Sequence, residues 1–582
     1  MKKSILLHLL LPLLVTAFLA ACSKEPTPWV PDSGEEGSYL PGEYQLPLIE
    51  TTDLHGYIVS ASNGALHYRM AFIADKVNDI RGRGDDYDKS RLLLLDGGDI
   101  YQGASISNLL GGKPVYVAMD RMGYDAVTVG NHEFDWGIDN LVDADATMPD
   151  YTWEGQECVN EVPIVCANLY RNGSRVSTTK DYVIVEKTAT NAKGAGIPVR
   201  IGIIGFAVDY ASSIMTSKFT GMGYSINEDY TIAGRIAAEL ESSGLCDATV
   251  LLIHGAADRA AEKLGPSSAI DLVLGGHSHQ SLSGTAGTGI PYLQGGRYGE
   301  HFARANLSFS VKEKNGGITF SGVTWPNIVL VDSVRDRRTS PGQNANDLEE
   351  DIIAVSDRAL AETEEQTSSV LGYITTGVTT YSISGSGGRS CTMANWMCDI
   401  LRRVGEADVA FVNGGGVRTQ FPLEGQSRRN ITVANIYEMF PFNNLTYVYK
   451  LTYEELLRVL EYSVTSAGES LFTSMTGIDC YFSNYAVSSL RKDGTVIYEK
   501  KRWTGDWASR TVTLAVSEYL ATNQRVDSYT GLTNPLLEWN ETPRLLFNEL
   551  VDNENAILVL REEAAASGGL LSIDTATHYI AI

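Results

Sequence analysis

Residues 248–279 read ATVLLIHGAADRAAEKLGPSSAIDLVLGGHSH, and this stretch contains the pattern that decides the fold. Two short apolar runs, residues 248–253 and 272–274, each lead into a polar cluster that contains histidine. A helical pattern separates the two runs. This alternation is typical of a layered α/β domain whose chemistry lies on loops beyond the ends of the strands.

The alternation extends from about residue 44 to residue 333. Further apolar runs are residues 45–49, 91–95, 126–129 and 199–204. We therefore predict a first α/β domain over residues 44–334. Residues 335–343 have the composition of a linker, and the acidic, periodic stretch that follows predicts a helix, so we assign residues 335–366 to a linker with a helix.

A second domain is predicted over residues 367–582. It has a Gly/Ser loop at residues 384–388, a helix at residues 393–404 and a strand entering Asn413-Gly414-Gly415-Gly416-Val417-Arg418. These signals differ from those of the first domain. The two domains together predict an α/β protein of layered α+β type.

The first residues read as a targeting signal. Lys2 and Lys3 precede an apolar run that is shorter than the roughly 20 residues of a membrane-spanning helix, and Leu19-Ala20-Ala21-Cys22 follows. This resembles a bacterial lipoprotein signal. We expect a signal peptide at residues 1–21, lipidation of Cys22, a tether at residues 22–43, and anchoring in the bacterial cell envelope at the outer membrane, facing either the periplasm or the outside.

Composition narrows the possible partners. The chain has 582 residues, of which 43% are hydrophobic and 20% charged, so wholesale disorder and a polytopic membrane protein are excluded. It has 46 Lys and Arg against 71 Asp and Glu, a formal net charge of −25, which argues against a nucleic-acid polymer as partner. A small anionic substrate fits, because a metal ion can reverse the local sign. No oligomeric state follows from the sequence.

Five of the nine histidines fall in compact polar clusters flanked by glycine or acidic residues. The clusters are Thr52-Asp53-Leu54-His55-Gly56, Asp96-Gly97-Gly98-Asp99, Gly130-Asn131-His132-Glu133-Phe134-Asp135, Ile253-His254-Gly255 and Gly275-Gly276-His277-Ser278-His279. Asp53 and His55 are two apart, so on an extended segment both would face the same ion, and His277 and His279 repeat this spacing.

These clusters predict a metal centre rather than structural histidines. Imidazole, carboxylate and amide oxygen together suit Zn, Mn or Fe better than Ca. The candidate ligands are Asp53, His55, Asp99, Asn131, His254, His277 and His279. Because seven ligands exceed the four of a structural zinc site, two divalent ions, such as Zn or Mn, are the simplest interpretation.

The five clusters, in this order, resemble those of the calcineurin-like dinuclear metallophosphatases, and the second domain is similar to that of the 5′-nucleotidases. The resemblance covers residues 45–527. It implies a four-layer β-sandwich with flanking helices, followed by a C-terminal α/β substrate-binding domain. It also implies which residues bind the metal ions. Asp53, His55, Asp99 and His279 would hold one ion, and Asp99, Asn131, His254 and His277 would hold the other. His132 would stabilise the transition state, and Asp135 would orient it.

The same resemblance implies where the nucleoside binds. Asn413, Gly415, Gly416 and Arg418 match the family's Asn-Gly-Gly-x-Arg loop, and Arg389 matches one arginine of a neighbouring segment. Phe442 and Asn444 lie in the family's Pro-Phe segment, where the Phe stacks on the base. Tyr519 stands where Phe is usual on the opposite face. Residues 523–527 replace the family's Gly-Gly-Asp, which leaves Asp527 as the candidate for the ribose.

The sequence thus predicts an exported, lipid-anchored, metal-dependent phosphohydrolase that releases phosphate from nucleotides. The alternatives are a hydrolase of 2′,3′-cyclic nucleotides, nucleotide sugars or another phosphomonoester, and a non-catalytic surface protein that binds a nucleoside or a host ligand. The complete ligand set favours an enzyme, because a protein that only binds would not need all of it.

Overall fold

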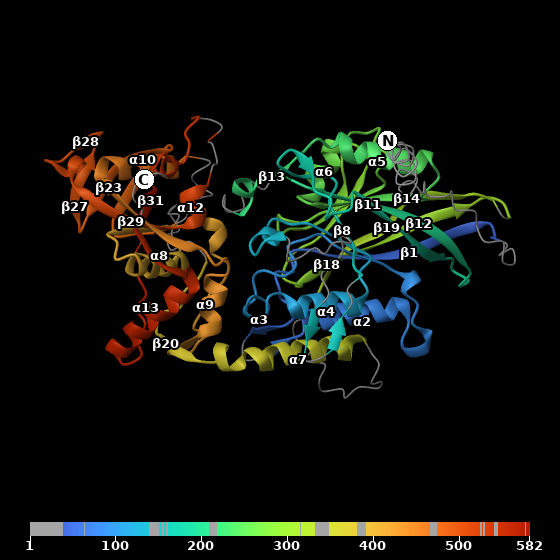
Figure 1. Cartoon of the computed structure of the whole chain (residues 1–582), viewed down its shortest axis with the longest axis horizontal. Coiled ribbons are helices and arrows are strands. Elements are labelled where there is room, and N and C mark those ends of the chain that lie inside the picture. The colour runs from blue at the N-terminus through green and yellow to red at the C-terminus, as the bar shows by residue number, and fades with distance from the viewer. Residues whose placement is uncertain are drawn as a thin grey trace, which may run out of the picture.

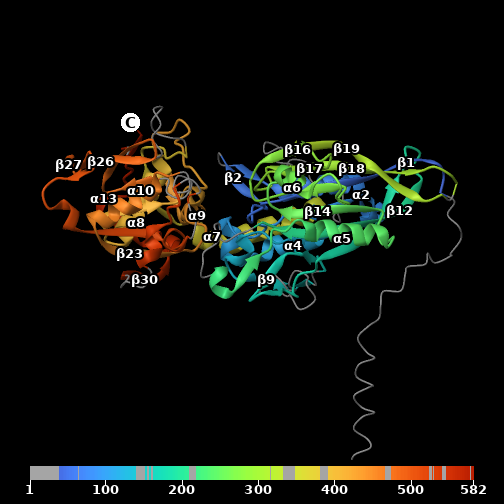
Figure 2. The same ribbon diagram turned by 90° about the horizontal axis from the view of Figure 1, so that it is seen from above.

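The computed structural model describes residues 39–62, 65–138, 151–153, 156–158, 161–208, 218–314, 316–331, 348–380, 391–465, 474–523, 527, 530–539, 545–576 and 578–581. The predicted signal peptide and Cys22 lie outside these residues. Within the described part of the chain, no helix combines the length and apolarity needed to cross a membrane. Figures 1 and 2 show two bodies, an N-terminal one in blue to green and a C-terminal one in orange to red.

In the residues that the structure describes, the N-terminal domain is built on twelve hydrogen-bonded strands. These are β1 (Gly42–Thr51), β4 (Leu93–Asp96), β5 (Ala126–Thr128), β8 (Ile164–Val165), β11 (Tyr182–Thr190), β12 (Gly196–Ala207), β14 (Ala248–His254), β15 (Leu272–Leu274), β16 (Ser281–Thr285), β17 (Pro291–Gly295), β18 (His301–Val311) and β19 (Ile318–Leu330). Two short pairs are β2 (Ser60–Ser62) with β3 (Ala65–His67) and β6 (Tyr151–Trp153) with β7 (Gln156–Cys158), among the described residues. A three-stranded sheet has the order β10 (Ser174–Arg175), β9 (Leu169–Arg171) and β13 (Tyr224–Ile226).

The twelve strands form two halves that pack against each other face to face. One half contains β8, β5, β4, β1, β18 and β19, and the other contains β11, β12, β14, β15, β17 and β16. The pairing of Gln45 with Thr190 joins the two halves. Leu46 and Leu48 of β1 share a buried core with Val250 and Leu252 of β14. Alternating side chains therefore fill the space between the halves, as expected for a sandwich.

Helices cover both outer faces. They are α2 (Arg69–Arg81), α3 (Ser105–Leu109), α4 (Lys113–Met122), α5 (Thr231–Ser242), α6 (Ala257–Leu264) and α7 (Leu348–Thr367). Ile49, which points away from the inner core, packs with α2, α4 and α7, and Ile253 packs with α5 and α6. The predicted four-layer α/β sandwich is therefore confirmed.

The predicted linker helix is α7, which belongs by its packing to the first domain. Ile352, Val355 and Ala359 of α7 are buried in the same core as α2 and α4. Figure 1 shows α7 in yellow beneath the N-terminal domain and reaching the C-terminal one. The next strand, β20 (Val370–Ile374), begins three residues after α7 ends, so the chain passes between the two domains just after Thr367.

The described part of the C-terminal domain contains two five-stranded sheets and a two-stranded one. The first contains β24 (Ser474–Thr476), β21 (Val409–Val412), β29 (Thr511–Ser517), β23 (Leu445–Thr452) and β30 (Leu545–Val551). The second contains β28 (Arg502–Trp503), β27 (Thr495–Glu499), β26 (Ala486–Lys492), β25 (Asp479–Ser483) and β31 (Tyr579–Ala581), and β20 pairs with β22 (Arg429–Thr432).

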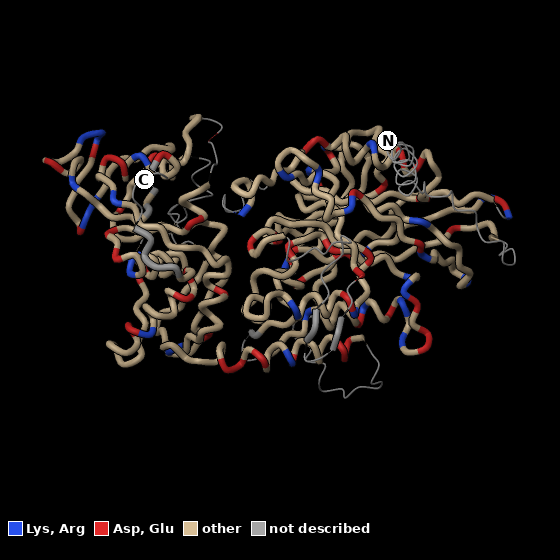
Figure 3. The backbone as a smooth tube through the Cα atoms, in the orientation of Figure 1, with Lys and Arg blue, Asp and Glu red and all other residues tan. Residues whose placement is uncertain are grey.

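The helices of this domain are α8 (Thr392–Val404), α9 (Val433–Met439), α10 (Tyr453–Ser463), α12 (Glu518–Thr522) and α13 (Asp552–Ser567). Helix α10 begins at a capping box in which Thr452 accepts from Glu455 N and the Glu455 carboxylate accepts from Thr452 N. The predicted helix at residues 393–404 and the strand before Asn413 correspond to α8 and β21. Figure 3 shows Lys and Arg spread among Asp and Glu over both domains.

Candidate metal centre and substrate pocket

The strand ends of the first domain place the candidate ligands. β1, β4 and β5 are parallel to one another, as are β14 and β15. Because the carboxyl ends of parallel strands meet at one edge, the loops that follow them converge. Asp53 and His55 follow β1, Asp99 follows β4, Asn131 follows β5, His254 ends β14, and His277 and His279 follow β15.

The backbone at these ligands is unusual. Asp53, His55, Asp99, His277 and His279 all have φ between 47° and 66°. Residues other than glycine rarely adopt this left-handed region, and such positions gather at functional sites. The expectation that each of the two predicted pairs lies on an extended segment is therefore wrong. Strand β1 ends at Thr51, before Asp53 and His55, and the left-handed backbone at Asp53, His55, His277 and His279 places the side chains in tight turns.

Glu133 ties two ligand loops together. Its buried carboxylate accepts from the backbone nitrogens of Asp99 and Ile100 at 2.9 Å and of Gly130 at 2.6 Å. The loops approach so closely that a Cβ on Gly130 would lie 2.2 Å from Asp99 Oδ1. Glycine is therefore required at position 130, and the Glu133 carboxylate fixes the two ligand loops relative to each other.

The first group of ligand atoms comes from Asp53, His55, Asp99 and His279, and these atoms lie within 4.8 Å of one another. His55 Nε2 faces His279 Nε2 at 3.2 Å, and His279 Nε2 lies 3.4 Å from Asp53 Oδ1. His55 Nδ1 contacts the backbone oxygen of Gln102 at 2.8 Å. An N–H donated there leaves Nε2 unprotonated and directed into the group, as a metal ligand requires.

The second group comes from Asp99, His254 and His277. Asn131 Oδ1 joins it, 2.8 Å from His277 Nδ1 and 3.3 Å from His254 Nε2. His254 Nδ1 lies 2.6 Å from Gly97 O, which again fixes the ring with Nε2 inward. The two groups share Asp99, which is the division that the family resemblance implies. Nitrogen and oxygen donors converging in this way fit two divalent metal ions.

Burial and neighbouring charges shift the pKa values of this cluster in opposite directions. Burial lowers the pKa of His55 and lowers that of His277 to about 3, so both rings are neutral and able to bind a metal. Burial raises the pKa of Asp53 to about 7. Burial alone would lower the pKa of His254, but the charge and hydrogen bond of Asp99, together with the charge of Asp53 and the bond to Gly97, raise it to about 10. Such a mixture of shifts marks a functional cluster.

His132 and Asp135 lie beside the metal groups. His132 Nδ1 is 2.7 Å from Asp135 Oδ2, and the His132 backbone nitrogen donates to Asp99 Oδ1 at 2.8 Å. Burial lowers the pKa of His132, but Asp135 and then Asp99 outweigh it, so the net shift is upward. The ring is thus fixed by one carboxylate and attached through its backbone to the shared ligand.

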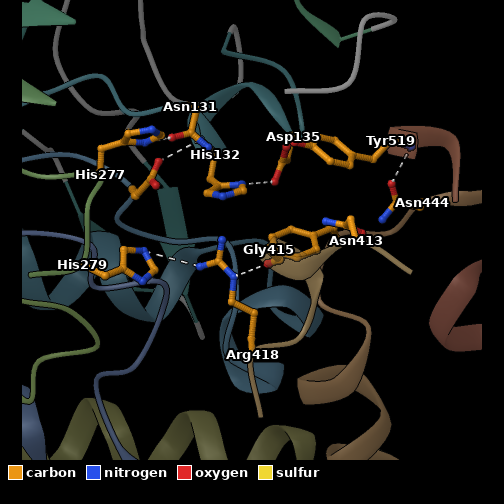
Figure 4. A pocket seen from close by; sticks show the side chains of 12 residues that line it. Asn131, His132, Asp135, His277, His279, Asn413, Gly415, Arg418, Asn444 and Tyr519 are labelled. Carbon is orange, nitrogen blue, oxygen red and sulfur yellow. Dashed lines mark hydrogen bonds and ion pairs between the residues drawn. The ribbon is translucent and has the colours of Figure 1, made fainter. Parts of the chain in front are cut away.

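Residues of both domains line one cavity of about 150 Å³ at this centre. The lining residues are Asp99, Asn131, His132, Asp135, His277, His279, Asn413, Gly415, Arg418, Phe442, Asn444 and Tyr519. In Figure 4, Arg418 reaches toward His279, while His132 and Asp135 lie across the pocket. Arg418 donates from Nε to Gly415 O at 2.7 Å, and its Nη1 lies 3.4 Å from His279 Nε2.

The structure does not bring every predicted substrate residue to this cavity. Gly416 lines a smaller cavity instead, which shares Asn413, Phe442 and Asn444 with this one. Asp527 is buried, and its carboxylate accepts from Thr530 N and Oγ1 at 2.7 Å, so it shapes a turn instead of lining the pocket. Arg389 lies outside the described residues.

Sequence reasoning missed Tyr298, whose ring centroid lies 5.5 Å from those of both His55 and His279. Its backbone nitrogen donates to Asp53 O at 2.7 Å, which braces the first ligand loop. The signal was present, because Gly295-Gly296-Arg297-Tyr298-Gly299 follows a short strand in the same way as the five clusters. This segment contains no histidine, so a search for histidine clusters does not identify it.

Comparison with known proteins follows the same division of the chain. Residues 370–504 match the model of the 5′-nucleotidase C-terminal domain. The chain is 24% identical to a 5′-nucleotidase of Vibrio cholerae over 85% of this chain and 89% of that one. It is 22% identical to the trifunctional nucleotide phosphoesterase YfkN of Bacillus subtilis over 76% of this chain. The crystal structure of a 5′-nucleotidase precursor from Thermus thermophilus shares the fold, with a TM-score of 0.66, 19% identity and coverage of 92% of this chain and 99% of that one.

These relatives are not all of the same length. The chain spans 29% and 37% of the two Bacillus subtilis relatives that it matches, but nearly the whole of the Vibrio protein. The predicted resemblance to 5′-nucleotidases is confirmed. The homologues are 5′-nucleotidases and phosphoesterases, which are metal-dependent hydrolases.

Proposed function

We propose that this chain, a homologue of the 5′-nucleotidases over most of its length, is a dinuclear metal-dependent phosphohydrolase that releases phosphate from nucleotides. One observation carries the proposal: seven nitrogen and oxygen ligands converge in two groups that share Asp99, at the end of a cavity that the second domain completes. Divalent metal ions bound there would polarise a phosphoryl group and acidify a water molecule.

The residues around this centre have defined tasks. The His132 ring, held by Asp135, would donate a proton or a hydrogen bond to the phosphoryl or leaving oxygen as negative charge develops. Arg418 brings a permanent positive charge to the first metal group from the second domain and would bind phosphoryl oxygens. Phe442 and Tyr519 line the same cavity and would contact the base.

The test is a phosphate-release screen of the metal-loaded protein. Its substrates are nucleoside mono-, di- and triphosphates, cyclic nucleotides and sugar phosphates. We expect the highest kcat/KM for a nucleotide. Asp99→Ala protein, which lacks the shared ligand, measures the background. Release no faster than this background for every nucleotide would refute the proposal.

A second candidate substrate class is favoured by another cavity that Arg418 also lines. This cavity has a volume of about 910 Å³ and is lined from both domains, by Tyr57, Arg69 and Tyr298 on one side and by residues such as Gln420 and Ala434 on the other. A nucleotide sugar has a substituent on each side of the attacked phosphorus, so it needs room on both sides of the metal centre. The relative YfkN is named a trifunctional nucleotide phosphoesterase.

Filling this cavity separates the two substrate classes. Ala434→Phe should lower hydrolysis of a nucleotide sugar and leave that of a nucleoside monophosphate unchanged. An equal effect on both would reject the nucleotide sugar as a substrate that uses this cavity.

We also propose export and lipid anchoring through Cys22. Support comes from the basic start, the apolar run and the small residues before the cysteine. Radiolabelled palmitate should be incorporated into the parent protein and not into Cys22→Ser. Equal labelling of the two would exclude Cys22 as the anchor.

A further inference from the structure

The backbone oxygen of Pro441 is held by two side-chain amides of the other domain. Gln102 Nε2 donates to it, and Asn108 Nδ2 donates to it at 3.2 Å. Both donors come from the segment that follows the shared ligand Asp99, Asn108 within α3. A carbonyl oxygen has two lone pairs, so it can accept both bonds at once.

One of the two amides is buried, and the other is oriented by a second hydrogen bond. Gln102 is fully buried. Asn108 Oδ1 accepts from Gly103 N at 2.9 Å, which orients its amide so that Nδ2 faces Pro441. A polar group buried at an interface costs free energy when it loses its partner, so separating the domains here must break two hydrogen bonds and rehydrate both amides.

Residues 440–444, which include Phe442, are also hydrogen-bonded to their own domain. Asn553 Nδ2 donates to Phe440 O at 3.0 Å and to Asn443 Oδ1 at 2.7 Å. Asp552 Oδ2 accepts from Asn444 Nδ2 at 3.2 Å, and the Asp552 backbone nitrogen donates to Asn444 O at 2.8 Å. Residues 440–444 therefore move with the C-terminal domain, so the contacts of Pro441 O depend on the position of that domain relative to the N-terminal one.

Gln102 also touches the metal centre through its backbone. Its carbonyl oxygen contacts His55 Nδ1, while its side chain holds Pro441. We propose that Gln102 and Asn108 form an interdomain latch on the Pro441 carbonyl, which sets the fraction of molecules in which Phe442 and Arg418 stand at the metal centre. Gln102 and Asn108 are positioning residues. The kinetic consequence rests on the proposed phosphohydrolase function, but the domain separation does not.

The latch is tested by measuring the distance between the domains. Spin labels are placed on Ser242→Cys in α5 and Lys501→Cys, both exposed, in the full chain. The cysteines at 166, 246, 391, 398 and 480 are free and buried, and the protein without the two new cysteines gives the background labelling. Pulsed EPR is recorded for the parent, Gln102→Met, Asn108→Ala and the double variant.

We call the arrangement with Pro441 O bound the closed form and one in which these bonds are broken the open form. Each loss should raise the ratio of open to closed molecules by roughly 2- to 10-fold, the scale of one hydrogen bond. Gln102→Met keeps the side-chain volume and the backbone contact to His55. The matched control is Asn395→Ala, which loses the hydrogen bonds of a side-chain amide within the C-terminal domain, donated to Ala576 O and accepted from Ser474 Oγ. It should lower the melting temperature without widening the distance distribution. A double variant with the parent's distance distribution would overturn the proposal.

Kinetics give an independent readout. Because a binding site that is complete in fewer molecules binds more weakly in proportion, KM for a nucleoside monophosphate should rise by the factor by which the closed fraction falls, with kcat and metal content little changed. A fall in kcat with loss of metal would instead mean damage at His55 and would reject the latch. If no nucleotide is hydrolysed by any variant, the proposed function fails, and the distance distributions still decide the latch.

Discussion

The ring of Phe442 stacks on the ring of His132, with centroids 5.1 Å apart and planes inclined by 21°. One ring belongs to the C-terminal domain and was predicted to hold a base. The other belongs to the metal-binding domain and was predicted to act on the phosphoryl group. The guanidinium of Arg418 lies over the same Phe442 ring at 5.1 Å. Substrate recognition and phosphoryl chemistry therefore meet in one contact between the domains.

His132→Ala should keep its metal but lose turnover by roughly 10²-fold or more, the scale of a lost general acid or charge stabiliser. Asp99→Ala should lose metal instead, because its carboxylate belongs to both ligand groups. Metal analysis alongside kcat distinguishes the two variants. Normal turnover by a metal-loaded His132→Ala protein would show that the role assigned to this ring is wrong.

Tyr519→Ala should lower kcat/KM for a nucleoside monophosphate by roughly 5- to 150-fold, since one stacked base face contributes about 1 to 3 kcal/mol. Hydrolysis of a small phosphomonoester without a base should hardly change. Phe442→Ala should reduce both activities, because this ring also packs on His132. No loss in Tyr519→Ala on the nucleotide would mean that this pocket does not hold the base.

Glu133→Ala should destabilise the fold by about 3 kcal/mol or more, because it leaves three buried backbone N–H groups without their acceptor. It should also weaken metal binding, since the loops of Asp99 and Asn131 lose their common anchor. Denaturant unfolding and metal titration measure the two effects. Glu161→Ala, at an exposed acid of the same domain, is the control and should change neither.

His578 should make stability depend on pH. Hydrogen bonds from its ring to Asp574 and Asp479, at 2.6 and 2.7 Å, raise its pKa above 6.5 despite partial burial, and Arg402 faces Asp574. A raised folded-state pKa gives stability that is fully present below pH 6.5 and is lost as pH rises through the folded value. The melting-temperature advantage of the parent over His578→Gln should therefore shrink between pH 6 and pH 9. An advantage that grows with pH would contradict this.

The sequence predicted the parts of the fold and site that periodicity and glycine-flanked clusters encode. β14 and β15 were visible as apolar runs because both faces of a central parallel strand are buried. The ligands after them were visible because five histidine or carboxylate clusters stood at the ends of such runs. Their backbone conformation was not visible, because left-handed φ at Asp53 or His279 is imposed by the surrounding loops.

The contacts that join the two domains could not be predicted. Gln102 and Asn108 bind a backbone oxygen of the other domain, and an amide that binds a carbonyl 339 or 333 residues away along the chain has no characteristic spacing. The local contacts of Asp527 could not be predicted for a related reason. Its place in the chain suggests the ribose, and the bonds that its Oδ1 accepts from Thr530 N and Oγ1 are present only in the folded turn.

The measurement that tests the central claim most directly is activity against metal content. The protein is stripped with a chelator, verified as metal-free, and titrated with Zn or Mn while phosphate release from a nucleotide is followed. The account predicts no turnover without metal and full activity at about two ions per chain. Undiminished turnover in the verified metal-free protein would contradict it.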